Sequence, residues 1–219
     1  MKLFFGIFFT IVGFFSSSSA QSVKLLPENV HFVAEKGEDV IDYFLKGDWM
    51  HAQQIVNSMS MKEKSVVSFM QDNQMPASSV DDFYYFMFRL NALIQQKGNR
   101  IQPALVANQI TNLLIDIQGH YVHNVPLQVA QMDYLGREIM LLTQVKDDYG
   151  LLNRRIAELD KVWKSLQQVV LDKGGNKVAK QVNQVINELQ KNVSRQRMIK
   201  KDNNILDLVD ELENTLRRK

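Results

Sequence analysis

Residues 152–170, LNRRIAELDKVWKSLQQVV, decide the fold class. Their apolar side chains recur at steps of four and three residues, at Leu152, Ile156, Leu159, Trp163, Leu166 and Val170. A spacing that averages about 3.5 residues puts all of them on one face of an α-helix and favours the shallow left-handed crossing of helical bundles. The segment is therefore predicted to be a helix whose apolar seam packs against other helices.

The same periodicity extends from this segment in both directions along the chain. Upstream it places Val80, Phe83, Met87, Leu90 and Ile94 on one stripe, and near the end of the chain it aligns Ile205, Val209, Leu212 and Leu216. No stretch alternates convincingly with period two, and no repeat of about 20–50 residues indicates a solenoid. We predict an all-α, up-and-down bundle of about seven helices, forming a single domain over residues 37–219.

Glycine and proline mark the expected helix ends. Gly47 and the DKGGN segment at 172–176 are predicted to end helices, because glycine readily adopts the left-handed conformation that closes a C-terminus. Gly136 differs, since it falls inside a predicted helix, where glycine costs about 1 kcal/mol relative to alanine. Its position predicts either the close approach of another helix or room for a ligand.

The first 20 residues have the order of a secretory signal peptide. Lys2 precedes an apolar run of 13 residues over 3–15, and SSSSAQS follows, which predicts cleavage after Ala20. The run is shorter than the roughly 20 apolar residues that span a bilayer, so no transmembrane segment is predicted. Residues 21–36 contain Pro27 and no sustained period, and we expect an extended lead-in there. The mature chain is expected to be exported, to the periplasm or outside the cell.

Composition excludes several classes of site. The chain has no cysteine, which rules out a disulfide framework, a thiolate metal cluster and a lipidated cysteine. Its formal net charge is +2, so no global field draws it to nucleic acid. The segment 101–144 carries only Asp116, Asp133, Arg137 and Glu138 as charged residues, and we expect this middle part of the chain to be the most buried.

A candidate metal site lies in the stretch DIQGHYVHN at 116–124. We favour the interpretation that Gly119 ends a helix there, which leaves the histidines in a connecting loop. In the alternative, the helix continues and Asp116, His120 and His123 share one face, as a three-ligand set for zinc, iron or copper. The sequence by itself leaves both open, with no cofactor as the favoured prediction.

Two other sequence patterns contain residues that can bind metals, but they are weaker evidence for a metal site than the stretch at 116–124. ENVH at 28–31 is a Glu-x-x-His pair of the kind that di-iron bundles use, but it falls in the predicted lead-in, which argues against such a site. Met59 and Met61, with His51 nearby, have the soft ligands of copper sites, but methionine is also a common filler of irregular cores.

The run FYYFMF at 83–88 is the first candidate for a ligand or partner surface. Large aromatic side chains at helical spacing usually fill a bundle interior, so we favour a buried helix here. The run nevertheless has more aromatic residues than one stripe can bury, at Tyr84, Tyr85 and Phe88. That excess keeps binding of a protein partner or a small apolar ligand as the second interpretation.

Arg137 and Glu138 form the second candidate, because they lie in the least charged part of the chain. The favoured interpretation is structural, with Asp133 pairing with Arg137 one turn later and fixing the register of a helix. The functional interpretation is a buried polar site, since desolvated charges cluster at such sites.

A basic segment, RQRMIKK at 195–201, completes the candidates. Its charges would spread around a helix, which predicts a solvated surface with at most weak contact to anionic lipid headgroups, and no nucleic-acid binding. The chain has no nucleophile elbow, phosphate-binding glycine loop or zinc-protease helix motif. We therefore expect an exported, non-enzymatic helical bundle that binds a protein partner or a small apolar ligand, with a metal-binding bundle as the alternative.

Overall fold

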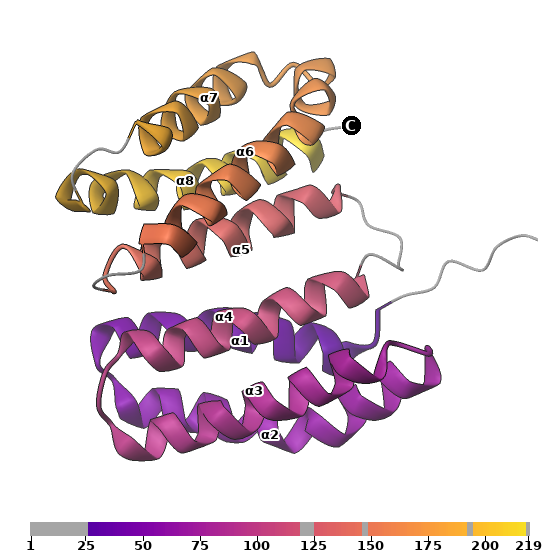
Figure 1. Ribbon diagram of the computed structural model, residues 1–219. Coiled ribbons are helices and arrows are strands. Elements are labelled where there is room, and N and C mark those ends of the chain that lie inside the picture. Colours follow the sequence, from indigo (N-terminus) through magenta and orange to yellow (C-terminus); the bar gives the residue numbers. More distant parts are fainter. Residues whose placement is uncertain (1–25, 119–124, 146–148, 192–194, 218–219) are drawn as a thin grey trace, which may run out of the picture.

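The computed structural model describes residues 26–118, 125–145, 149–191 and 195–217, with the side chains of the last segment described from Ile205 onward. These residues form eight α-helices and no strand (Figure 1). The helices are α1 (Glu28–Lys46), α2 (Trp49–Asp72), α3 (Ala77–Gln96), α4 (Ile101–Gln118), α5 (Leu127–Leu142), α6 (Tyr149–Asp172), α7 (Asn176–Gln190) and α8 (Arg195–Arg217). The all-α bundle prediction is confirmed, with eight described helices where about seven were predicted.

The helices form two four-helix units that lie one above the other in Figure 1. In the first unit α1 packs against α2 and α4, and α3 closes the square against the same two helices. In the second, α5 and α7 each pack against α6 and α8. The contact between α4 and α5 joins the units, and consecutive helices run in alternating directions, as in an up-and-down bundle.

Each unit has its own apolar core. All five residues of the Val80–Ile94 stripe are buried in the first core, and all six of the Leu152–Val170 stripe are buried in the second, as predicted. Leu105 of α4 packs against both cores, and Leu141 of α5 belongs to the first core although its helix belongs to the second unit. The two cores therefore meet across the α4–α5 contact.

The predicted helix ends at Gly47 and Gly174 are confirmed. Both glycines have a left-handed backbone, with φ of 75° and 78° respectively. At the C-terminal end of α1, the N–H group of Gly47 donates to the carbonyl of Phe44 and the N–H group of Asp48 donates to the carbonyl of Tyr43, which caps the last turn. These ends let α2 and α7 turn back against their predecessors.

The extended lead-in predicted for residues 21–36 is wrong from Glu28 onward. Helix α1 begins at Glu28, directly after Pro27, and its buried face includes Val30, Val33, Ala34 and Gly37. The first turns of this face carry only valine, alanine and glycine, so no large apolar side chain marks the start of the helix in the sequence. Helical residues at 28–36 form one wall of the cleft described below.

The buried position favoured for the aromatic run is also wrong in part. Phe83 is fully buried, but Tyr84, Tyr85 and Phe88 are 43%, 50% and 75% exposed. Among the described helices, α3 has its main contacts with α2 and α4, so these neighbours cover a single stripe and the aromatic side chains outside it stay exposed.

Two glycines mark close contacts between helices. A Cβ atom on Gly136 would lie 3.0 Å from Ile205 Cγ2 and 3.1 Å from Leu206 Cδ2, so α8 approaches α5 closely at that point, as predicted. Gly37 of α1 is tighter still, since its Cβ would lie 2.8 Å from Cγ2 of the buried Thr111 in α4.

Replacing Gly37 with alanine should therefore destabilise the first unit. We expect Gly37→Ala to lower the free energy of unfolding by about 1–2 kcal/mol, because the clash with Thr111 outweighs the gain in helix propensity of about 1 kcal/mol. Urea unfolding measures the difference. The matched control is Gly150→Ala in the first turn of α6, where the added Cβ has only Arg154 Nη1 at 3.9 Å and stability should stay equal or rise. A Gly37→Ala variant as stable as that control would contradict the close packing of α1 on α4.

The predicted signal peptide, residues 1–20, lies outside the described residues. Within the described part of the chain, no helix combines the length and the apolar character that crossing a bilayer requires.

Candidate functional site

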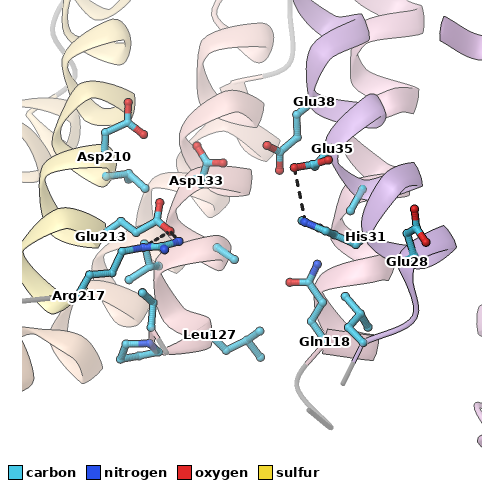
Figure 2. Close-up of a pocket in the computed structure, with 17 residues that line it drawn as sticks. Glu28, His31, Glu35, Glu38, Gln118, Leu127, Asp133, Asp210, Glu213 and Arg217 are labelled. Carbon is cyan, nitrogen blue, oxygen red and sulfur yellow. Dashed lines mark hydrogen bonds and ion pairs between the residues drawn. The ribbon is translucent and has the colours of Figure 1, made fainter. Parts of the chain in front are cut away.

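A cleft of about 830 Å³ lies between the two four-helix units (Figure 2). One wall comes from α1 and the end of α4, and the opposite wall comes from α5 and α8. The volume is within the range of about 300–1,000 Å³ that small-molecule sites occupy. The cleft is therefore the candidate functional site.

Six carboxylates line the cleft, three on each wall. They are Glu28, Glu35 and Glu38 on α1, Asp133 on α5, and Asp210 and Glu213 on α8. The basic residues of the lining are His31, whose Nε2 lies 3.5 Å from Glu35 Oε1, and Arg217, whose Nε donates to Glu213 Oε1 at 3.0 Å. Because the whole chain carries a formal net charge of +2, the acidic character belongs to this cleft and not to the protein at large.

Apolar side chains form the rest of the lining. They are Leu26, Ala34, Val125, Pro126, Leu127, Val129, Ala130 and Val209, contributed by both units. A surface that alternates carboxylates with aliphatic groups suits a ligand with both a positive charge and an apolar body.

Arg137 lies behind the cleft and connects the two walls. Its side chain is 10% exposed, and its Nη2 donates to Asp133 Oδ2 on the same helix and to Glu38 Oε1 on α1 at 2.9 Å. The predicted Asp133–Arg137 pair is therefore confirmed. Glu38, which is 99 residues away in sequence, is the partner that the sequence did not reveal.

The pKa of Asp133 is raised to about 6. Burial is the largest cause, the Arg137 guanidinium opposes it, and the carboxylates of Glu38, Asp210 and Glu213 raise the value further. Asp133 thus changes its charge near neutral pH, whereas an unperturbed aspartate does so near pH 4.

This shift predicts a pH dependence of stability. The folded state holds the Asp133 proton more tightly than the unfolded chain does. The stabilisation that comes from this proton is therefore fully present below about pH 4 and is lost as the pH rises through 6. From about pH 4 to above pH 6, the free energy of unfolding of the native chain should fall by about 2–3 kcal/mol relative to that of Asp133→Asn. The asparagine variant has no proton to release at this position. Urea unfolding at a series of pH values measures it. The exposed Asp81→Asn should follow the native profile, and a pH-independent difference between native chain and Asp133→Asn would contradict the assignment.

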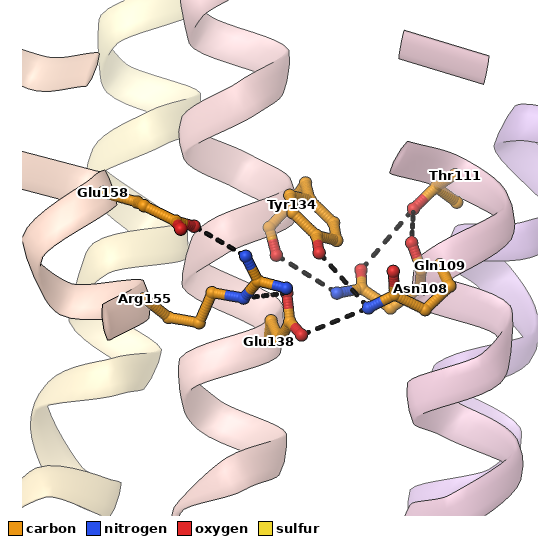
Figure 3. A network of polar contacts seen from close by, with 7 residues as sticks. All are labelled: Asn108, Gln109, Thr111, Tyr134, Glu138, Arg155 and Glu158. Carbon is orange, nitrogen blue, oxygen red and sulfur yellow. Dashed lines mark hydrogen bonds and ion pairs between the residues drawn. The ribbon is translucent and has the colours of Figure 1, made fainter. Parts of the chain in front are cut away.

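Glu138 belongs to a separate buried network between α4, α5 and α6 (Figure 3). It is 2% exposed, accepts a hydrogen bond from Gln109 Nε2 at 3.1 Å, and lies 3.0 Å from Arg155 Nε. Gln109 also donates to Tyr134 Oη at 3.2 Å, and burial raises the pKa of Tyr134, which keeps the phenol neutral. The network joins the two units but does not line the cleft, so the structural interpretation of Glu138 fits its surroundings.

The other predicted site residues lie elsewhere. Tyr84, Tyr85 and Phe88 are on the outer face of α3 and take no part in the cleft lining. Asp116 is exposed on α4, and His120 and His123 lie outside the described residues, so the metal alternative stays a prediction. Among the side chains that the structure describes, no group of three His, Asp or Glu residues could hold a metal ion.

The cleft includes residues that the sequence analysis set aside. The ENVH segment, assigned to an extended lead-in, is the first turn of α1, and both Glu28 and His31 line the cleft. A search for carboxylates at helical spacing, at 28, 35, 38 and 42 in steps of seven, three and four residues, could have found the acidic stripe of α1. The basic side chains of 195–201 lie outside those described.

Comparisons with protein families, with curated proteins and with solved structures gave no significant match in any of the three. Function is therefore argued from the geometry of the cleft.

Proposed function

We propose that the protein is a non-enzymatic binding protein whose cleft holds a small molecule with a positive charge on an apolar body. The observation that carries the proposal is the lining, in which six carboxylates and eight aliphatic or proline side chains share one cleft of about 830 Å³. The export expected from the first 20 residues would place this binding in the periplasm or outside the cell.

The charge of the lining narrows the ligand class expected from the sequence. A wholly apolar ligand would remove water from the carboxylates and supply no counter-charge, which is costly. A cation with an apolar body offsets that cost, because its charge meets the carboxylates while its body covers residues such as Leu127, Val129 and Val209. In place of the small apolar ligand expected from the sequence, we therefore propose a cationic amphiphile.

Binding without catalysis is proposed because the described lining has no serine, threonine or lysine side chain, and four of its six carboxylates, which are the other candidate nucleophiles, are engaged with basic side chains. Its charged groups are mostly engaged with one another, through Arg137 with Asp133 and Glu38, through Arg217 with Glu213, and through His31 with Glu35. Such a lining can recognise charge and shape.

Isothermal titration calorimetry with a matched series of ligands tests the proposal. Decyltrimethylammonium has both the cation and the tail, tetramethylammonium has only the cation, decyl maltoside has only the tail, and decyl sulfate has the tail with the opposite charge. Below the micellar concentrations, decyltrimethylammonium should bind at least about tenfold more tightly than the others, which corresponds to about 1.4 kcal/mol. Equal or tighter binding of decyl sulfate would overturn the proposal.

Charge variants locate the binding in the cleft. The double variant Glu35→Gln, Asp210→Asn removes one exposed carboxylate from each wall and should weaken decyltrimethylammonium binding about tenfold. The matched control, Asp81→Asn with Asp82→Asn, removes the same charge from the exposed surface of α3 and should leave affinity unchanged. Equal weakening by both pairs would mean a response to net charge alone.

A protein partner is the second candidate, favoured by the exposure of Tyr84, Tyr85 and Phe88 on α3. A photo-crosslinking amino acid at position 88 in host cells should then give a specific protein adduct. The same group at Tyr149, which is 58% exposed on α6, is the control and should give none. Identical adducts from both sites would remove this candidate.

A further inference from the structure

The two walls of the cleft belong to different four-helix units and carry charge of the same sign. Glu28, Glu35 and Glu38 lie on α1 of the first unit, and Asp133, Asp210 and Glu213 lie on α5 and α8 of the second (Figure 2). Like charges that face each other across a cleft repel, and most strongly where water is partly excluded, as at Asp133, whose side chain is 28% exposed. The walls therefore repel each other to the extent that basic side chains such as Arg137 and Arg217 do not offset their charge.

The units are held together on the other side of this cleft. Helices α4 and α5 are in contact, and the buried network around Gln109 and Glu138 ties them with hydrogen bonds and the ion pair to Arg155. At the cleft itself, the described connection is Arg137, which reaches from α5 to Glu38 on α1. A firm contact beside a charged cleft is the arrangement of a hinge.

We propose that the two units form a clamp that a cation closes, with the α4–α5 contact as its hinge. A positive charge that enters the cleft offsets the repulsion between the walls and draws α1 toward α5 and α8. Arg137 is the resident cation that limits opening when the cleft holds no ligand. This inference rests on the proposed function for the class of the natural ligand. Closure itself should need only a cation of suitable size.

A proton should act in the same direction as a cation. Asp133 is faced by Arg137 on its own helix, by Glu38 and the His31–Glu35 pair from α1, and by Asp210, Glu213 and Arg217 from α8, and the α4 residue in the described lining is the uncharged Gln118. Closure buries Asp133 in this acidic surrounding, so the closed arrangement holds the proton more tightly than an open one. By linkage, acidic pH favours closure and rising pH favours opening.

The distance between the walls can be measured directly, because the chain has no cysteine and accepts a single pair of labels. Asp39→Cys on α1 and Asn214→Cys on α8 place spin labels on exposed positions of opposite walls, outside the cleft lining. Pulsed electron spin resonance then gives the distance distribution at pH 7.5 and low salt, at pH 5, and at pH 7.5 with saturating spermidine as the probe cation.

We expect the mean distance at pH 7.5 to shorten by about 2 Å or more at pH 5 and with spermidine. In the Glu35→Gln, Asp210→Asn background the distance should be short under all three conditions, because the walls no longer repel strongly. The Asp81→Asn, Asp82→Asn background should behave like the native chain. In the Asp133→Asn background, part of the response to pH should be lost while the response to spermidine remains.

Two results separate this inference from the proposed function. Distances that stay constant under all conditions, while calorimetry shows selective binding of decyltrimethylammonium, would overturn the clamp and leave the binding site in place. Shortening at pH 5 and with spermidine, without selective binding of decyltrimethylammonium, would support the clamp and overturn the proposed ligand class. A neutralised variant that still shortens as much as the native chain would also overturn the clamp.

Discussion

Arg137→Met is expected to lower the free energy of unfolding by about 3–5 kcal/mol. The substitution keeps an unbranched side chain of similar length but removes the positive charge between Asp133 and Glu38. Breaking a buried ion pair by removing one partner is costly, since the remaining charge stays desolvated. Asp133 has a pKa of about 6 although the guanidinium lowers it. Removing the guanidinium should therefore raise the pKa of Asp133 further.

Two further variants show whether the cost comes from the uncompensated charge. Adding Asp133→Asn to Arg137→Met should restore part of the lost stability, since the amide needs no counter-charge. Arg154→Met removes an exposed arginine from α6 and should change stability by less than about 0.5 kcal/mol. Urea unfolding at pH 7.5 compares all four chains, and a cost below about 1 kcal/mol for Arg137→Met would show that the guanidinium does not hold the two walls.

Trp163→Ala is expected to cost a similar amount, about 3–5 kcal/mol, for a different reason. The indole is 1% exposed in the core of the second unit, and its Nε1 donates to Asn183 Oδ1 on α7 at 2.8 Å. Truncation leaves a large cavity between α6 and its neighbours and removes the hydrogen bond to Asn183.

Hydrogen exchange should show where the stability is lost. Because Trp163 belongs to the second core, amides of α6 and α7 should lose protection first, whereas those of α2 and α3 should change less. Trp163→Phe should retain most of the stability, and Val169→Ala, at a residue 42% exposed on the same helix, should change it little. A uniform loss of protection in both units would show that they unfold as one cooperative body.

The two buried polar groups near the unit boundary have different consequences for function. Glu138 is enclosed with Gln109, Tyr134 and Arg155 between α4, α5 and α6, and the hydrogen bonds and ion pair of this network specify how these helices pair. Arg137 is buried too, but both of its carboxylate partners line the cleft. Of the two neighbouring residues, Arg137 is therefore the one whose partners belong to the proposed binding cleft.

The helices could be predicted wherever large apolar side chains mark one face. Every residue of the stripes at 80–94 and 152–170 is buried, because a helix with one apolar face must cover it. The prediction was wrong at the start of α1, where the buried face has no large apolar side chain, and for Tyr84, Tyr85 and Phe88, which the described helices leave exposed. The spacing of apolar side chains shows which residues share a helix face, but it does not show how many other helices pack against that helix.

The candidate site was much less accessible to sequence reasoning. The Asp133–Arg137 pair could be predicted because residues four apart are neighbours on a helix. Glu38 could not, since it comes from a helix in the other four-helix unit. The acidic cleft likewise assembles carboxylates from α1, α5 and α8, none of which is unusual in its own segment.

By itself, the sequence determined that this protein is an all-α bundle, where the helices before Gly47 and Gly174 end, and which face is buried in the helices that carry a stripe of large apolar side chains. These are local properties, set by side-chain spacing and by the backbone freedom of residues such as Gly47 and Gly174. Only the tertiary structure decided that the helices divide into two units and that six carboxylates meet between them. The physical reason is that facing charges depend on how helices pair across long separations in the chain, and apolar periodicity carries no information about that pairing.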